Sequence, residues 1–320
     1  MKENKGGMTM KGLTLSLGLA ALACLPMSGM AQDTSADLAP GIPYTFQTVN
    51  YPSDVFTQLF GINDTGEIAG YHGSGLTGHP NRGFTLDLPL TFTPENVPGA
   101  VQTQVVGINN AGSTCGFYID TAGANRGFLR INGHFIYPID YPPTNSSPPV
   151  NQLLGLNSSG QSAGFYNDKA FNSHGYVFAQ FGNVLSVFYI KGAVSATATG
   201  VNEAGQVSGF YTDSVNNMHG FLLNQGHFTI LNFPGATGTQ AFGLNNEGQV
   251  VGSYTDLSGM THGFIWTSGT GFAGPYDDPK NPGATIINGI NDGAVIVGFS
   301  GVCVSAPMGA TKCDGFVAFP

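Results

Sequence analysis

Short apolar stretches alternate along this chain with clusters of Gly, Asn, Asp and Pro. After residue 31 none of them shows the three-to-four-residue spacing of an amphipathic helix, so we predict that the chain folds into β-strands. The stretches follow a frame that occurs six times: Gly, an aliphatic residue and Asn, then a second Gly nine residues after the first. The frame begins, at intervals of 43 to 48 residues, at Gly61, Gly107, Gly155, Gly200, Gly243 and Gly289.

Each repeat is predicted to contain four strands. The first ends at the frame Asn, where the step N-x-x-G predicts a tight hairpin with Gly in the left-handed conformation. In the sixth repeat this glycine, Gly293, comes one residue early, which still suits a short hairpin. An aromatic-rich stretch such as Gly116–Asp120 forms the second strand, and the third begins at a step such as His219–Phe221. The fourth strand ends at Pro, which cannot donate to a ladder.

Units of about 46 residues with four strands each have the size of propeller blades. The sixth repeat stops after its third strand, at Pro320, and a spare strand of the fourth type lies at Tyr44–Pro52. The two chain ends are therefore expected to complete one blade together, which leaves no open sheet edge between the first and last units. We predict an all-β fold for residues 44–320: a six-bladed β-propeller of four-stranded blades, with the last blade completed by the N-terminal strand.

The first 31 residues have the pattern of a secretory signal peptide. Three lysines precede the apolar run Leu13–Met27, and small residues follow as far as Ala31, after which we place the cleavage. A lipoprotein acylated at Cys24 is the alternative. The apolar run is too short to span a membrane and no later segment approaches the required length, so we expect no transmembrane segment. Residues 32–43 are assigned to a linker, and the protein is predicted to be secreted, either periplasmic or extracellular.

Charge narrows the range of partners. Removing residues 1–31 takes three of the 10 basic residues and one of the 19 acidic residues, which leaves 7 and 18 and a net charge of −11. A nucleic-acid-binding protein needs a basic face that displaces counterions, so we expect no nucleic acid partner. Only 9% of the residues are charged and 41% are hydrophobic, which indicates a folded chain. We expect a monomer.

Three cysteines remain after the predicted cleavage. Cys303 and Cys313 bracket one loop, and in an exported protein such a pair favours a disulfide over a metal site. Cys115 has no evident partner in its apolar strand, so we interpret it as a buried, inert thiol.

One polar pair recurs in the loops between the second and third strands. The functional interpretation is a ring of acid–base dyads on one face, whereas the structural interpretation, which the identical register favours, is that each pair ties its own hairpin. The frame Asn residues likewise favour turns that bond their own backbone over calcium ligands. Four aspartates, Asp120, Asp168, Asp213 and Asp256, each lie six residues before a cation, respectively Arg126, His174, His219 and His262.

The first repeat departs most from the pattern, between Tyr71 and Arg82. This stretch lacks the Asp and instead carries His72, His79 and Arg82, so it is a candidate ligand-binding loop, with a solvated variable loop as the alternative. A metal pair of His72 and His79 would need a third ligand that the sequence does not indicate. We therefore assign no metal ligands and expect no cofactor.

The sixfold frame resembles the repeat of the bacterial extracellular HAF-repeat proteins, named after a His-Ala-Phe step. The match covers residues 56–319, but here Gly replaces Ala throughout, and His is present only at His174, His219 and His262. The resemblance implies export and a repeat architecture, and no agreed activity.

Nothing in the sequence indicates a catalytic constellation. There is no H-E-x-x-H helix and no G-x-S-x-G elbow. The predicted function is a binding or interaction module for carbohydrate, protein or another envelope ligand. The alternatives are an extracellular polysaccharide-acting enzyme (a lyase or glycoside hydrolase) that uses His72, His79, Arg82 or the histidine series, and a structural envelope protein.

Overall fold

The computed structural model describes residues 38, 41–76, 78–141, 145–179, 183–303 and 312–320. The predicted signal peptide, residues 1–31, and most of the predicted linker lie outside the described residues. No helix in the described ranges could span a membrane.

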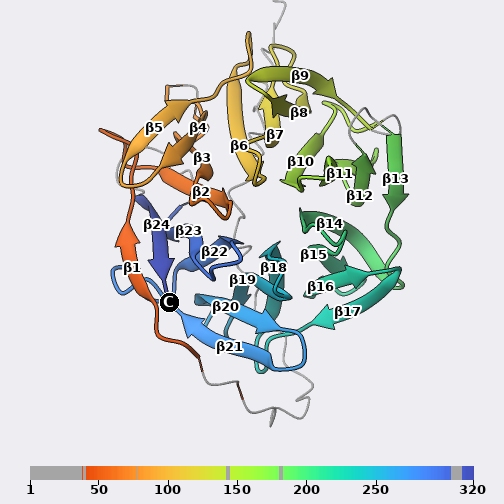
Figure 1. The fold of residues 1–320 in the computed structure, drawn as a ribbon. Coiled ribbons are helices and arrows are strands. Elements are labelled where there is room, and N and C mark those ends of the chain that lie inside the picture. The colour runs from red at the N-terminus through yellow and green to blue at the C-terminus, as the bar shows by residue number, and fades with distance from the viewer. Residues whose placement is uncertain (1–37, 39–40, 77, 142–144, 180–182, 304–311) are drawn as a thin grey trace, which may run out of the picture.

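The described strands form six antiparallel four-stranded sheets in a ring around a central channel, each with its first strand innermost (Figure 1). Blade 1 is β2 (Thr57–Ile62), β3 (Ile68–His72), β4 (Arg82–Asp87) and β5 (Thr91–Pro94); blade 2 is β6 (Gln102–Ile108), β7 (Thr114–Ile119), β8 (Asn125–Ile131) and β9 (His134–Ile139); blade 3 is β10 (Asn151–Leu156), β11 (Gln161–Asn167), β12 (Ser173–Ala179) and β13 (Asn183–Val187); blade 4 is β14 (Ala193–Val201), β15 (Val207–Asp213), β16 (Met218–Asn224) and β17 (His227–Leu231); blade 5 is β18 (Gly238–Leu244), β19 (Gln249–Thr255), β20 (Thr261–Thr267) and β21 (Gly271–Tyr276).

Blade 6 joins the two ends of the chain. It contains β22 (Thr285–Ile290), β23 (Ile296–Gly301), β24 (Cys313–Phe319) and, on the outside, β1 (Thr45–Thr48). β1 pairs antiparallel with β24, from Thr45 opposite Phe319 to Thr48 opposite Phe316. The prediction that the N-terminal strand completes the last blade is confirmed, and with it the six-bladed propeller.

The first glycine of each frame allows neighbouring inner strands to approach closely at the channel. A Cβ atom on Gly243 would lie 2.6 Å from the carbonyl oxygen of Asn288 and 2.9 Å from Cα of Gly289 in the next blade. A Cβ on Gly289 would lie 2.3 Å from the carbonyl oxygen of Phe60, across the junction between blades 6 and 1. Any larger residue would push two blades apart, which explains why the frame always begins with Gly.

The six frame Asn residues form a closed ring of hydrogen bonds around the channel, which we call the Asn ring. Each side-chain oxygen accepts the backbone N–H four residues later, as expected for an Asn that closes its own turn. Each side-chain amide also donates to the carbonyl oxygen of the next frame Asn, a contact that the sequence did not predict. The six bonds run Asn63→Asn109 (3.1 Å), Asn109→Asn157 (3.1 Å), Asn157→Asn202 (2.9 Å), Asn202→Asn245 (3.1 Å), Asn245→Asn291 (3.0 Å) and Asn291→Asn63 (3.1 Å).

The turn of the sixth frame differs from the prediction. In the other five frames the turn glycine has a positive φ, between 70° and 88°. Here Ala294, with φ of 58°, takes the left-handed position, and Gly293 does not. The turn keeps its length, since Ala294 N–H still bonds to the carbonyl oxygen of Asn291, and so an L-residue occupies a strained conformation.

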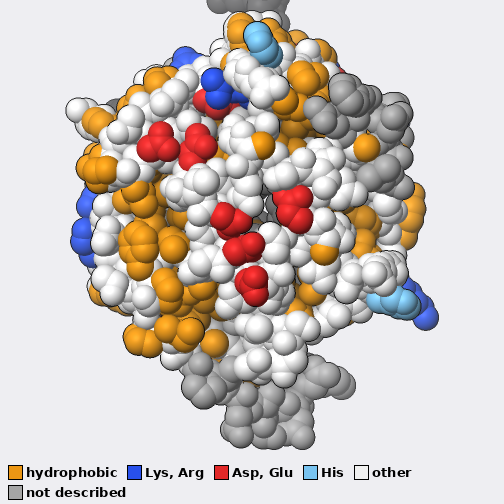
Figure 2. Space-filling model, in the orientation of Figure 1, with side chains coloured by type: hydrophobic (Ala, Val, Ile, Leu, Met, Phe, Trp, Pro, Cys, Tyr) orange, Lys and Arg blue, Asp and Glu red, His pale blue; other side chains and the backbone are white. Residues whose placement is uncertain are grey.

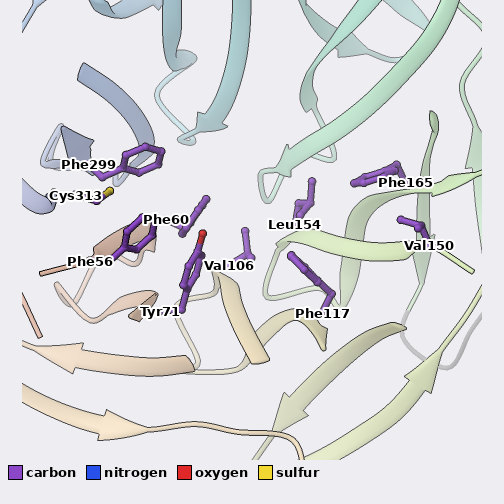
Figure 3. Close-up of a cluster of buried hydrophobic side chains, with 10 residues drawn as sticks. All are labelled: Phe56, Phe60, Tyr71, Val106, Phe117, Val150, Leu154, Phe165, Phe299 and Cys313. Atoms are coloured by element: carbon purple, nitrogen blue, oxygen red, sulfur yellow. The ribbon is translucent and has the colours of Figure 1, made fainter. Parts of the chain in front are cut away.

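Aromatic and aliphatic side chains fill the spaces between blades. The aromatic residue that follows Gly at the start of each third strand is buried, from Phe84 in blade 1 to Phe316 in blade 6. A second cluster includes Phe60 on β2 and Leu154 on β10 and draws on blades 1, 2, 3 and 6 (Figure 3). Cys115 is free and fully buried, as predicted, and burial raises the pKa of its thiol to about 12.

The predicted disulfide is present. Cys303 follows β23 and Cys313 begins β24, and their sulfur atoms are bonded with the Cα atoms 4.8 Å apart. The bond therefore closes the connection between the second and third strands of blade 6, at the same end of the propeller as the His/Arg–Asp pairs.

Candidate functional site

The two ends of the propeller differ in chemistry. At one end lie the turns between first and second strands, and acidic side chains gather there around the central opening (Figure 2). Asp64, Glu203 and Asp292 line this mouth. Their carboxylates accept backbone N–H groups from the neighbouring turn: Ser158 donates to Glu203 at 2.7 Å and Asp292 donates to Asp64 at 2.8 Å. These acids therefore help to hold adjacent blades together.

The channel itself contains a cavity of about 110 Å³. Its lining consists of aliphatic residues, glycines and the aromatic residues Phe60, Phe210 and Phe242, with Thr199 and Asn288 as the polar members. None of these lining side chains titrates, so the cavity offers no acid–base chemistry.

The predicted pairs of Asp with His or Arg form at the opposite end, in blades 2 to 5. In every pair one carboxylate oxygen accepts two backbone N–H groups of its own hairpin, and the other oxygen faces the cation. Each aspartate therefore ties its hairpin, which is the interpretation that the identical register favoured. The four contacts are Asp120–Arg126 at 2.8 Å, Asp168–His174 at 3.0 Å, Asp213–His219 at 3.3 Å and Asp256–His262 at 3.4 Å.

In three of these blades the side chain of the Arg or His also contacts the residue directly after the outer strand. Nδ1 of His219 lies 2.8 Å from Asn232, and Nδ1 of His262 lies 2.8 Å from Asp277. Arg126 forms an ion pair with Asp140 in the same place. Both sides of the cation are thus occupied in blades 2, 4 and 5, which leaves it little capacity to bind a ligand.

Blade 3 departs from this arrangement. Phe188 N–H bonds to the carbonyl oxygen of Gly175, and in blade 4 Leu231 is paired with the equivalent glycine, Gly220. The next residue, Tyr189, therefore occupies the position that Asn232 has in blade 4. The Tyr189 side chain is 80% exposed. In the described part of the chain, Nδ1 of His174 has no hydrogen-bond partner, while its Nε2 contacts Asp168.

The surroundings of His174 are aromatic. Its ring stacks on Tyr166 with centroids 5.1 Å apart, and Tyr166 stacks in turn on Tyr141 at 4.6 Å. Burial and then the phenols of Tyr141 and Tyr189 raise the pKa of Tyr166. Phe171, in the β11–β12 hairpin of the same blade, is 48% exposed. We call Phe171, His174 and Tyr189 the blade 3 platform.

Two of the residues predicted in the irregular loop of blade 1, His72 and His79, contact the same carboxylate, that of Asp54. Oδ2 of Asp54 lies 2.7 Å from Nδ1 of His72 and 2.8 Å from Nε2 of His79. Although burial opposes it, hydrogen bonding by His72, Phe56 and His79 lowers the pKa of Asp54 to about 2.

Arg82, the third residue predicted in this loop, lies elsewhere. Its guanidinium donates to the carbonyl oxygen of Val101 at 3.3 Å in an exposed contact with blade 2. Asp54 was not a sequence candidate. An alignment of the connections between fourth and first strands would have shown that its position holds Ala in most other repeats.

The described residues offer no catalytic nucleophile of the elbow type. The letters G-x-S-x-G occur at Gly160–Gly164, but Ser162 is fully buried within β11, opposite Leu156 and Phe178. Glu95 is also buried, bonded to Thr114 and to Arg130, and burial raises the pKa of its carboxyl.

Comparison with known proteins supports the fold. No model of a known protein family matches the sequence. No curated protein sequence matches it either. Among solved structures, the chain is similar to AofleA from Arthrobotrys oligospora, with 12% identity, a TM-score of 0.51 and coverage of 81% of this chain and 84% of that one. It is also similar to the SapL1 lectin in complex with alpha methyl fucoside, with 12% identity, a TM-score of 0.51 and coverage of 79% and 91%.

Proposed function

We propose that this protein is an exported carbohydrate-binding propeller and that the blade 3 platform contacts the sugar. The observation that carries the proposal is the pair of exposed aromatic rings, Phe171 and Tyr189, in the same blade as a histidine whose Nδ1 has no partner among the described residues. A sugar ring has apolar C–H faces and hydroxyl groups at its edge. Aromatic rings pack against the faces and a planar polar group bonds the hydroxyls.

The repeat itself separates scaffold from site. In blades 4 and 5 the equivalent histidines use Nδ1 to hold Asn232 and Asp277. In blade 3 the equivalent position, after the outer strand, is Tyr189. The side chain that would bond to Nδ1 of His174 is therefore replaced by an exposed ring. A position that ties the blade elsewhere is therefore free, in this blade, to bind a ligand.

Two further observations agree with this function. SapL1, which shares the fold, is a lectin whose structure holds alpha methyl fucoside, and this suggests methyl α-fucoside as the first probe. The Cys303–Cys313 disulfide suits an oxidising compartment outside the cytoplasm, in agreement with the predicted signal peptide. Membership of the HAF-repeat proteins remains a prediction that supports export.

The test is calorimetric titration of purified residues 32–320 with methyl α-fucoside and a panel of neutral monosaccharides and oligosaccharides. A shallow platform should bind with a Kd of about 0.1–1 mM. Tyr189→Ala should weaken binding about tenfold or more, whereas Tyr189→Phe, which keeps the ring, should retain most of it.

Leu257→Ala is the matched control, because Leu257 is 85% exposed at the tip of the corresponding hairpin in blade 5. It should leave affinity unchanged. The proposal fails if no saccharide saturates the protein, or if Tyr189→Ala binds as well as the unaltered chain. Release of a cleaved or unsaturated product from an oligosaccharide would instead favour the polysaccharide-acting enzyme.

A further inference from the structure

We propose that Asp54, His72 and His79 bind a divalent transition metal ion, for which Zn²⁺ is the best match. One ligand atom from each residue lies within 4.8 Å of the others. Two imidazoles and one carboxylate form a common protein ligand set for zinc, and neutral imidazole nitrogen suits borderline ions better than calcium or magnesium. This site is in blade 1 and does not depend on the carbohydrate-binding proposal.

The first argument is that Asp54 is not needed by the turn that carries it. Asp54 N–H bonds to the carbonyl oxygen of Tyr51, and three other connections between blades have the equivalent bond with Ala as the donor. The turn therefore forms without a carboxylate, and blade 1 has gained one. The three equivalent donors are Ala100, Ala193 and Ala236, which bond to Val97, Ile190 and Phe233; in blade 6 the equivalent donor is Asn281, which bonds to Asp278.

The second argument is that His72 replaces a tyrosine. It lies two residues after the second frame glycine, where blades 2 to 5 have Tyr118, Tyr166, Tyr211 and Tyr254. The stacking at this position does not require His. His72 stacks on Tyr51 with centroids 3.7 Å apart, and Tyr254 stacks on Phe233 at the same distance. What the imidazole adds is a ring nitrogen directed at Asp54.

The third argument is that the connection carrying His79 is extended. Nine residues separate β3 from β4, since β3 ends at His72 and β4 begins at Arg82, whereas five separate β7 from β8. The extension places Nε2 of His79 at the same carboxylate oxygen. Three departures from the repeat, distant from one another in their repeat positions, thus meet at one point. Random divergence of the repeat would not bring three such residues together, whereas binding of one shared ligand explains why they meet.

The surroundings of the cluster orient its ligand atoms. Oδ1 of Asp54 accepts Phe56 N–H at 2.9 Å, which fixes the carboxylate and leaves Oδ2 for the metal. Nδ1 of His79 lies 3.2 Å from both the backbone N and Oγ of Ser74, which hold the ring with Nε2 inward; with a metal on Nε2, Nδ1 would carry the proton and donate to Oγ. The side chain of Asp54 is 8% exposed and that of His79 is 42% exposed, so the cluster opens to solvent on one side. A bound ion would have three protein ligands and a water molecule.

A metal at this point would fasten two parts of the ring. Asp54 belongs to the crossover from blade 6 to blade 1, whereas His72 and His79 belong to the β3 end and loop of blade 1. Metal binding should therefore stabilise the fold, and saturating Zn²⁺ should raise the Tm by about 5 °C. The ligand atoms need to separate by about half an ångström from hydrogen-bond contact to bond a common ion, which the exposed His79 ring allows.

The experiment uses purified residues 32–320 stripped with a chelator and dialysed, then titrated with Zn²⁺ in a buffer that does not bind metal. We expect one equivalent to bind with a micromolar or lower Kd, and Co²⁺ to give the visible absorption of a four-coordinate site. Asp54→Ala introduces the residue found in three of the other turns, and His79→Ala removes an exposed ring, so both variants should fold. Both should lose the bound equivalent and the rise in Tm.

His219→Ala is the control, because this histidine also contacts an aspartate but has no second histidine beside that carboxylate. It should keep the full equivalent of Zn²⁺. The proposal is overturned if the unaltered protein binds less than one equivalent of Zn²⁺ at a free Zn²⁺ concentration 100-fold above the expected Kd. It is equally overturned if Asp54→Ala and His79→Ala bind as the unaltered protein does.

Discussion

Substitution of one member of the Asn ring should destabilise the propeller far more than substitution of an asparagine in the same turns that lies outside the ring. Asn202 is 5% exposed, and its side chain amide donates to the carbonyl oxygen of Asn245 at 3.1 Å and to Oε1 of Gln206 at 2.8 Å. Its side-chain oxygen accepts Gln206 N–H at 2.9 Å. Asn202→Ala removes all three bonds without changing the backbone.

The magnitude follows from the bonds lost and the partners left behind. A typical intramolecular hydrogen bond contributes about 1 kcal/mol net, and a buried group left without a partner costs about 1–3 kcal/mol. The carbonyl oxygen of Asn245 is buried between blades, whereas Gln206 is partly exposed and can recover water. We therefore expect Asn202→Ala to lower the free energy of unfolding by about 2–4 kcal/mol.

Asn246→Ala is the control. Asn246 sits outside the Asn ring, accepts Glu203 N–H at 3.0 Å and donates to Asp292 at 2.9 Å, both in exposed contacts. Water replaces such bonds, so the loss should stay below about 1 kcal/mol. Urea unfolding followed by the fluorescence of Trp266 measures both variants. Equal losses in the two variants, or a loss below about 1 kcal/mol for Asn202→Ala, would refute the view that the Asn ring joins the blades.

Three further predictions concern single features of the fold. Ala294→Gly should raise the free energy of unfolding by about 0.5–1 kcal/mol, because it removes an L-residue from the left-handed conformation; a lower value in urea unfolding would mean that packing of the methyl group matters more. Replacing both Cys303 and Cys313 by Ser should lower stability by about 2–3 kcal/mol, and a reducing agent should then destabilise the native chain but leave the variant unaffected. Burial raises the pKa of Asp168, but bonds from His174 and the hairpin backbone outweigh it and hold the pKa at about 2. Because a lowered carboxyl pKa stabilises the fold above about pH 4 and is lost as pH falls toward 2, Asp168→Asn should be less stable than the native chain at pH 7 and equal to it near pH 2 in urea titrations. A gap between the two that does not change with pH would contradict this assignment.

Repetition explains what the sequence could predict. Six copies of one frame show which positions are structural, and that was enough for the strands, the six blades, the completion of the last blade by β1 and the tie of Asp168 to its hairpin. Spacing also predicted the Cys303–Cys313 bridge, because two cysteines that bracket one loop have few other partners.

Contacts between blades could not be read from the sequence. The side-chain amide of each frame Asn bonds across to another repeat, a partner about 45 residues away that no local pattern identifies. Asp54 was missed for the same reason, since it lies 25 residues before His79 and meets it only in space. Tyr189 was missed because its importance depends on the exposure of one ring, and exposure follows from the packed fold.

The Asn ring also bears on how the molecule can open. In a linear array of repeats the terminal unit has one neighbour and frays first. Here the frame Asn of every blade donates one amide hydrogen bond to the following blade and accepts one from the preceding blade. The bond from Asn291 to Asn63 makes the junction between blades 6 and 1 equivalent to the other five junctions. Opening any blade disrupts two such contacts. Hydrogen exchange of the inner strands should therefore be slow to a similar degree in all six blades, with no weak point where the chain begins and ends.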